Sequence, residues 1–411
     1  MPARMAAVDA QFYWMSAKIP SDQFLLYAFA GEPDFDRAIE EVRFRARACP
    51  HLVMRVDDGS ALTYPRWVPM SLGPTQLRRH RLDDDSWCGC LDAVVRLADD
   101  QLDVRRTPWR LHLFAPIRGI PGSSGAGTVA VLQVAHALAD GALASALAGW
   151  LFGRTTPVPD VTPTTAGFLP WRALAAARAH RELLRETENG RLGHPVGSRP
   201  LLLTNTRPAG TRTVRTLVRQ RTQLAGPTVT LTALAAISSA LAKHLGDSAA
   251  LLGAEVPMAK PGVRQAHNHF GNVTVGLYPD LPPADRIERI AADLANGRRR
   301  FEHRAARTGS RAFAAVPAPL LRWGVARFDV NARPNLVSGN TVVSSVYRGP
   351  ADLRLGDAPV VLTAGYPALS PSMGLTHGIH GIGDTVAISV HAAESAVGDI
   401  DAYVRRLDAE L

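Results

Sequence analysis

Residues 155–170 separate the chain into two parts. They read TTPVPDVTPTTAGFLP, with four prolines in sixteen residues. Proline removes a backbone donor and disfavours helix at the residue before it, so this segment is expected to run as extended chain. The full chain of 411 residues exceeds what one hydrophobic core usually holds. We therefore expect a first domain over 1–160, a crossover with a linker helix over 161–210, and a second domain over 211–411.

Helix and strand patterns alternate in the first part. Apolar residues recur at helical spacing over 35–49 and again over 87–97. Two strand-like runs follow, WRLHLFAPI over 109–117 and TVAVLQVAH over 128–136, with the turn sequence PGSSGAG between them. Glycine and serine at that point favour an antiparallel hairpin. The second run is almost wholly apolar, as expected of a strand that is buried on both faces.

The second part mixes the same elements. A charged helix is expected over 171–192, along the surface between the domains, and a buried helix over 232–245. The strand-like runs are TRTVRTLVRQ, GNVTVGLY, NTVVSSVY and DTVAISVHA, and an amphipathic helix ends the chain. The sequence thus predicts an α/β protein with mixed sheets flanked by helices.

Composition limits the cellular compartment and the classes of binding partner that we expect. The net charge of +9 and the pI near 10 favour anionic partners: a phosphate-bearing cosubstrate such as coenzyme A, an anionic lipid surface or nucleic acid. No nucleic-acid-binding motif is present, which excludes the last. Three cysteines make no disulfide framework, and no segment reads as a signal peptide or membrane span. We expect a cytoplasmic protein, with salt-sensitive peripheral contact at the inner face of the cell membrane as an option.

The segment HALADG carries the chemistry. His136, Asp140 and Gly141 form H-x-x-x-D-G between a buried strand and a helix. A histidine that is bonded locally through one ring nitrogen keeps the other free as a base near neutral pH. Asp140, one turn later, can pair with a basic residue and hold the loop, while Gly141 permits close packing at the helix start. The competing interpretation is a core histidine followed by a simple helix cap.

Other histidines suggest a metal site, but their surroundings do not. His267 and His269 lie in HNH, and His377 and His380 lie in THGIHG. No carboxylate or thiolate cluster accompanies them at ligand spacing. The sequence therefore predicts neither a metal nor a bound cofactor.

The chain resembles the bacterial wax ester synthase/diacylglycerol acyltransferase family, which is similar to chloramphenicol acetyltransferases and condensation domains. The resemblance extends from Asp9 to the C-terminus. It is carried by VDAQFYW, PWRLHL, VAHALADG, PTVTLTALAAISSAL, HFGNVTVGLYPDLPPADRIERI, TVVSSVYRGPADLRLGDAPV and GLTHGIHGIGDTVAISVHA.

This resemblance implies two chloramphenicol-acetyltransferase-like domains facing across a tunnel, in a monomer. Acyl-CoA is the implied co-substrate, and the acceptor is an alcohol or diacylglycerol, as in wax ester and triacylglycerol synthesis. His136 corresponds to the histidine that deprotonates the alcohol. Asn272 lies where the family places a loop near the tunnel. Asn272, Ser344 and backbone amides are the expected donors to the substrate oxyanion.

Five positions depart from the family pattern. The first histidine of the usual pair is Ala135, and the helix that usually begins T-V-N-D has Thr230 and Leu231. Ser345 stands in place of the late asparagine, and the basic residue after V-P is Lys260. Two alternatives follow: a silent lipid or acyl-chain carrier that kept the tunnel, and an acyltransferase that takes its donor from an acyl carrier protein.

Overall fold

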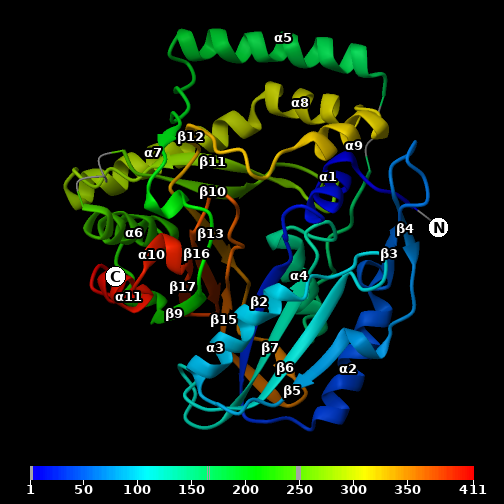
Figure 1. Cartoon of the computed structure of the whole chain (residues 1–411), viewed down its shortest axis with the longest axis vertical. Coiled ribbons are helices and arrows are strands. Elements are labelled where there is room, and N and C mark those ends of the chain that lie inside the picture. The colour runs from blue at the N-terminus through cyan, green and yellow to red at the C-terminus, as the bar shows by residue number, and fades with distance from the viewer. Residues whose placement is uncertain (1–2, 164, 166, 247–250) are drawn as a thin grey trace.

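Two six-stranded mixed sheets face each other in the computed structural model (Figure 1), which describes residues 3–163, 165, 167–246 and 251–411. The first sheet has the order β14-β15-β2-β7-β6-β5, and only its β5–β6 pair is parallel. Its strands are β2 (Gln23–Ala30), β5 (Leu77–His80), β6 (Trp109–Ile117), β7 (Gly127–Val134), β14 (Arg354–Leu355) and β15 (Ala358–Gly365). The predicted hairpin is the β6–β7 pair.

The second sheet has the order β11-β10-β13-β16-β17-β9. Its strands are β9 (Arg212–Gln220), β10 (Gly253–Ala259), β11 (Phe270–Gly276), β13 (Thr341–Tyr347), β16 (Leu375–Ile382) and β17 (Thr385–Ala393). The β10–β13 and β13–β16 pairs are parallel. Smaller sheets contain β1 (Ala3–Arg4), β3 (Met54–Asp57), β4 (Arg66–Pro69), β8 (Arg199–Pro200) and β12 (Leu336–Val337).

Helices flank the sheets. They are α1 (Ala7–Ser16), α2 (Phe35–Ala48), α3 (Trp87–Arg96), α4 (Gly141–Leu151), α5 (Leu169–Glu188), α6 (Val229–Leu245), α7 (Pro283–Glu302), α8 (Arg304–Ala314), α9 (Ala318–Arg327), α10 (Glu394–Val397) and α11 (Ile400–Asp408). Of these, α3 packs against residues of both sheets. The mixed α/β class is confirmed. Among the described helices, none is long and apolar enough to cross a bilayer.

The strand pairing departs from the predicted division at 211. β15, which belongs to the predicted second domain, pairs antiparallel with β2 and so completes the first sheet. Its apolar side chains Leu362 and Ala364 pack with Leu26 and Ala28 in one core cluster. β15 is not among the strand-like runs found in the sequence, and local sequence patterns do not determine which distant strand a strand pairs with.

A fragment of residues 1–160 is therefore expected to be insoluble or to aggregate when expressed alone. Without β15, the edge of β2 loses its partner and exposes apolar side chains, which makes it a template for intermolecular pairing. A fusion that appends residues 350–368 to the fragment through a flexible linker should recover soluble, monomeric protein. Size-exclusion chromatography of both fragments tests this expectation; a monomeric, folded 1–160 fragment would contradict it.

The expected linker helix is α5, but it does not lie between the two sheets. It runs along one end of the molecule over α8 (Figure 1). An ion pair between Arg304 and Glu182 connects the two helices, and Nε2 of His303 lies 3.6 Å from a carboxylate oxygen of Glu186. Within the preceding crossover, residues 164 and 166 are outside the described part of the chain.

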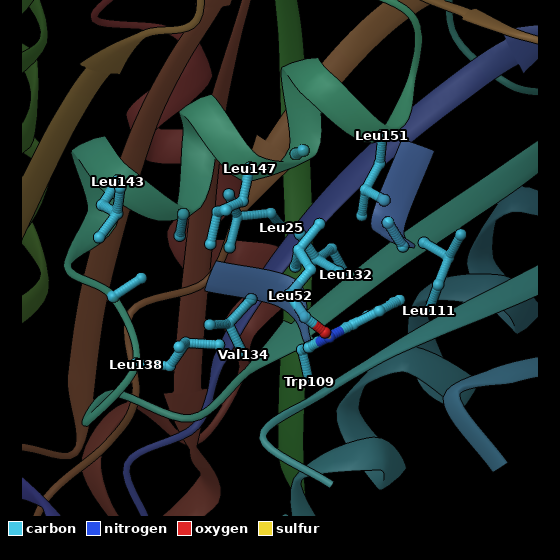
Figure 2. Close-up of a cluster of buried hydrophobic side chains, with 14 of the residues drawn as sticks. Leu25, Leu52, Trp109, Leu111, Leu132, Val134, Leu138, Leu143, Leu147 and Leu151 are labelled. Carbon is cyan, nitrogen blue, oxygen red and sulfur yellow. The ribbon is translucent and has the colours of Figure 1, made fainter. Parts of the chain in front are cut away.

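A leucine-rich core fixes the helix that follows HALADG. Figure 2 shows Leu143, Leu147 and Leu151 of α4 packed toward Leu25 and Leu132 of the first sheet. The indole Nε1 of Trp109, which is fully buried, donates to the backbone oxygen of Leu52 at 2.9 Å. Deleting one such buried leucine side chain typically costs about 2–5 kcal/mol, so this packing holds the start of α4 firmly.

Candidate active site

The HALADG segment forms the turn that leads from β7 into α4. β7 ends at Val134, two residues earlier than the predicted strand, so His136 lies in the turn itself. Asp140 is the N-cap of α4, and its Oδ1 accepts a hydrogen bond from the backbone amide of Leu143 at 2.9 Å. A carboxylate at this position accepts a hydrogen bond from an otherwise free amide, and its negative charge interacts favourably with the positive end of the helix dipole.

Asp140 also pairs with a basic residue from the second half of the chain. Arg264 donates from Nη1 to Oδ2 at 2.8 Å and from Nη2 to Oδ1 at 3.1 Å, and the backbone amide of His269 donates to Oδ2 at 2.8 Å. Burial by itself would raise the pKa of Asp140, but the hydrogen bonds and charge of Arg264 hold that pKa below its usual range. The basic partner is therefore Arg264 and not Lys260.

The imidazole of His136 is held in one tautomer by Asn268. Its Nδ1 lies 2.8 Å from Oδ1 of Asn268. The amide Nδ2 of Asn268 donates to the backbone oxygen of His136 at 2.8 Å and to Oδ1 of Asp9 at 3.0 Å. Both partners of Nδ2 can only accept, which fixes the amide orientation. Nδ1 of His136 must then carry the proton, and Nε2 has a free lone pair with no hydrogen-bond partner in the described part of the chain.

Asp9 of α1 anchors the loop that carries Asn268. Its carboxylate is fully buried and accepts from the backbone amides of His267 at 3.0 Å and Asn268 at 2.8 Å. It also faces Nδ1 of His267 at 3.3 Å. A buried carboxylate is costly unless several donors surround it, so these contacts join α1 to the loop from the other half of the molecule.

Two phenylalanines enclose the His136 ring. Phe12 stacks on it with a centroid distance of 4.2 Å and an interplanar angle of 8°, and the Phe270 ring lies 5.6 Å away. Burial lowers the pKa of His136 below its ordinary value of 6.5, against the hydrogen bond to Asn268 and the charges of Asp140 and Asp9, which favour the protonated form. The ring is therefore neutral at physiological pH, as a general base requires.

Asn272 lies on β11, two residues after Phe270 and on the same face of the strand. Its amide Nδ2 donates to Oε2 of Glu255 at 2.9 Å, and the residue is exposed. One amide hydrogen is thus already used, and the residue that contacts His136 is Asn268. A substrate-binding role for Asn272 stays a prediction.

Ser344 and Gly141 lie where the two sheets meet. The side chains of Ser344 and Val346 share one face of β13, and a Cβ built on Gly141 would be 4.0 Å from Cγ2 of Val346 and 3.9 Å from Oε1 of Gln23. These are ordinary contact distances, so the helix start has room for alanine but not for a large side chain. Ser344 is half-buried on the face turned toward HALADG.

Two of the positions that depart from the family pattern contact each other. Oγ1 of Thr230, at the start of α6, lies 2.7 Å from Oγ of Ser345 on β13. The hydroxyls thus satisfy each other, and neither leaves a buried polar group without a partner.

His377 has a structural role. His377 uses both ring nitrogens, with Nδ1 at 2.8 Å from Oγ1 of Thr341 and Nε2 at 2.8 Å from the hydroxyl of Tyr403. His380 is buried, and burial lowers its pKa. Across the described ranges, no group of three or more His, Cys, Asp or Glu side chains has an arrangement that could hold a metal ion.

A cavity of about 190 Å³ opens between the two halves of the molecule. It is lined by Asp22 and Phe24 at the start of β2, by α3, and by Arg212, Tyr366 and His391 from the second half. Asp22 neighbours Gln23, whose amide donates to the backbone oxygen of Ala139 in HALADG. Burial raises the pKa of Asp22 to about 6. The tunnel implied by the family resemblance remains a prediction.

Four functional residues were missed in the sequence: Asp9, Phe12, Arg264 and Asn268. Asp9 and Phe12 lie in VDAQFYW, and Asn268 is the middle residue of HNH. The first segment carries the family resemblance and the second has the spacing of a possible metal site, but neither pattern indicates a contact with His136. The asparagine between two histidines, just before a strand, is the sequence feature that could have indicated Asn268.

Comparisons with known proteins support the fold. Residues 267–411 match the family model of the WS/DGAT C-terminal domain. The wax ester synthase/diacylglycerol acyltransferase from Marinobacter aquaeolei VT8 is similar in structure, with a TM-score of 0.63 and 19% sequence identity over 99% of this chain and 98% of that chain. None of the curated proteins matches.

Condensation domains are similar as well. A variant of the starter condensation domain of rhizomide synthetase RzmA, in complex with C8-CoA, has a TM-score of 0.60 and 14% identity over 100% of this chain and 94% of that chain. Another variant, in complex with C8-CoA and Leu-SNAC, has a TM-score of 0.60 and 13% identity over 99% and 92% of the two chains. The predicted two-domain fold is confirmed.

Proposed function

We propose that this chain, which resembles the wax ester synthase/diacylglycerol acyltransferase family, transfers an acyl group from a thioester to a hydroxyl, with His136 as the general base. The observation that carries the proposal is the hydrogen bond from Nδ1 of His136 to Asn268, whose amide orientation is fixed by Asp9. It leaves the basic Nε2 unprotonated and without a protein partner in the described ranges.

The proposed reaction proceeds without a covalent enzyme intermediate. The hydroxyl oxygen attacks the thioester carbonyl while its proton moves to Nε2 of His136. The tetrahedral intermediate then collapses, the carbon–sulfur bond breaks, and the thiolate takes the proton back from Nε2. Donors to the oxyanion are typically worth about 3 kcal/mol. Ser344 and backbone amides of the HALADG turn are the proposed donors, while Asn272 first has to be released from Glu255.

Acyl-CoA is the proposed donor and a lipid alcohol the proposed acceptor. Two condensation-domain neighbours were solved with C8-CoA, and the net charge of +9 suits a polyphosphate cosubstrate. The assay is release of free coenzyme A from acyl-CoA, with and without a long-chain alcohol or diacylglycerol. Alcohol-dependent release with formation of the ester supports the proposal; the absence of turnover for all acceptors and donors would overturn it.

Replacing Asn268 by leucine is expected to lower kcat about 10- to 100-fold with little change in KM. The substitution keeps the branched shape of the side chain but removes the acceptor for Nδ1–H, so the His136 ring samples the wrong tautomer. Nitrogen NMR of the histidine side chains checks the cause: the wild type should show a protonated Nδ1, and the variant a mixture. An unchanged tautomer together with unchanged kcat would remove Asn268 from the mechanism.

The rate is expected to fall as the pH drops through a pKa below 6.5. Because burial lowers the pKa of His136, the neutral, active base persists to a lower pH than an exposed histidine allows. Protonation then removes the lone pair, so kcat/KM should be flat above pH 6.5 and decline below it. A pH profile with its midpoint well above 6.5 would point to a different base.

The same assay separates the two alternatives. A silent lipid carrier, for which the Thr230–Ser345 hydrogen bond is the specific observation, would bind acyl chains without consuming thioester. A carrier-protein-dependent enzyme would turn over acyl-carrier-protein but not acyl-CoA. Native mass spectrometry of the purified protein, followed by turnover with each donor, distinguishes them.

A further inference from the structure

Large apolar side chains gather on the surface of α5 and α9. Trp171 at the start of α5 is 69% exposed and Trp323 of α9 is 57% exposed. Around them, the exposed residues are Phe168, Leu174, Leu184, Leu320 and Phe328. Figure 1 shows α5 along one end of the molecule, with α9 at the side of the same end. Apolar groups gathered in this way on a surface usually mark an interaction site.

Arginines accompany these apolar side chains. The first half of α5 carries Arg172 and Arg178, α9 carries Arg322 and Arg327, and neither segment contains an acidic residue. The guanidinium of Arg327 lies over the Trp323 ring, 5.4 Å from its centroid. Tryptophan and leucine beside arginine is the composition of helices that lie in the interfacial layer of an anionic bilayer.

The fold does not need the outer face of α5. Ala179 and Thr187 are buried on the side toward α8, while Leu174, Arg181 and Leu184 on the opposite side are exposed. An amphipathic helix normally buries its apolar residues and exposes only polar ones. Apolar residues on the outward face therefore serve a contact outside the chain.

This surface lies one helix away from the proposed active site. Nζ of Lys18, just after α1, donates to the backbone oxygens of Ala326 and Phe328 at 2.6 and 2.7 Å. The guanidinium of Arg322 lies 5.6 Å from the centroid of the Trp14 ring. Since α1 also carries Phe12, which stacks on His136, α9 connects the exposed surface to the candidate site.

We propose that α9 and the first half of α5 form a docking surface for an anionic lipid bilayer, with Trp171 and Trp323 in the interfacial layer and the arginines against the headgroups. The docking does not depend on acyl transfer. If the proposed function holds, it would place His136 beside the membrane that supplies long-chain acceptors.

The test is flotation of the full chain with vesicles of phosphatidylcholine alone and of phosphatidylcholine with 30% phosphatidylglycerol. We expect binding to the anionic vesicles, and a weakening of several-fold when NaCl is raised from 0.1 to 0.5 M. The double variant Trp171→Ser/Trp323→Ser should bind at least tenfold more weakly. The matched control is Phe44→Ser, because Phe44 is 72% exposed beside arginines on α2, far from α5 (Figure 1), and should bind as the wild type.

Quenching of tryptophan fluorescence by lipids with brominated acyl chains shows whether the tryptophan side chains enter the bilayer. The wild type should be quenched, and most of that quenching should disappear in the double variant. No binding to anionic vesicles, equal binding by wild type and double variant, or equal loss in Phe44→Ser would each overturn the proposal. So would light scattering that shows a wild-type dimer which the double variant abolishes. Vesicle binding without thioester turnover supports docking and counts against acyl transfer. Turnover without vesicle binding supports acyl transfer and counts against docking.

Discussion

Replacing His136 by alanine is expected to lower turnover by about 10²- to 10⁴-fold, the usual contribution of a general base. The reason is geometric. Asn268 holds the proton on Nδ1, so Nε2 is the nitrogen of His136 that can accept the hydroxyl proton. The loss should appear in kcat, because the imidazole is needed in the transition state more than for substrate binding.

The fold should survive this substitution with a modest loss of stability. Alanine removes one hydrogen bond to Asn268 and the stacking on Phe12, which together are worth about 1–3 kcal/mol. Thioester consumption and thermal melting are measured on the same preparations. His194→Ala is the matched control, because His194 is exposed; it should retain wild-type turnover. A folded His136→Ala protein with full activity would remove His136 from the chemistry.

Local patterns predicted the elements that build the first half of the site. The apolar run ending near His136, the glycine-rich turn before it and the aspartate that begins α4 are each encoded within about ten residues of sequence. Alternation, turn composition and capping act at that range, so β6, β7 and α4 are formed as expected. The two-residue difference at the end of β7 arises because Ala135 pairs with the backbone of Pro108 outside the strand ladder.

The other half of the site depends on contacts that no local pattern contains. Asp9 and Asn268 are separated by 259 positions in the chain, and Asp140 and Arg264 by 124. Their pairing follows from how the two halves pack, not from the residues beside them. The same limit explains β15, which is not among the predicted strands and pairs with β2 far along the chain, and Asn272, whose neighbour Glu255 lies on the adjoining strand.

The ion pair between Asp140 and Arg264 joins these two halves, and its loss should have the largest effect on stability. The side chains are only 4% and 12% exposed. Replacing Arg264 by leucine leaves the Asp140 carboxylate buried, with the amides of Leu143 and His269 as its remaining donors. Breaking a buried pair in this way typically costs about 3–5 kcal/mol. Turnover should fall as well, because the loop that carries Asn268 loses its anchor on HALADG.

A double-variant cycle separates the free energy of the Asp140–Arg264 interaction from the contributions of the two individual side chains. Asp140→Asn keeps an oxygen to cap α4 but removes the charge, so Arg264→Leu/Asp140→Asn buries no unpaired carboxylate and should recover more than half of the stability lost in Arg264→Leu. Arg37→Leu is the control, since the Arg37–Glu41 pair is exposed and should contribute no more than about 1 kcal/mol. Denaturant unfolding of all four variants gives the free energies. Additive losses would show that the two side chains act independently, and a fully stable but inactive Asp140→Asn protein would assign Asp140 to the chemistry instead of to the loop.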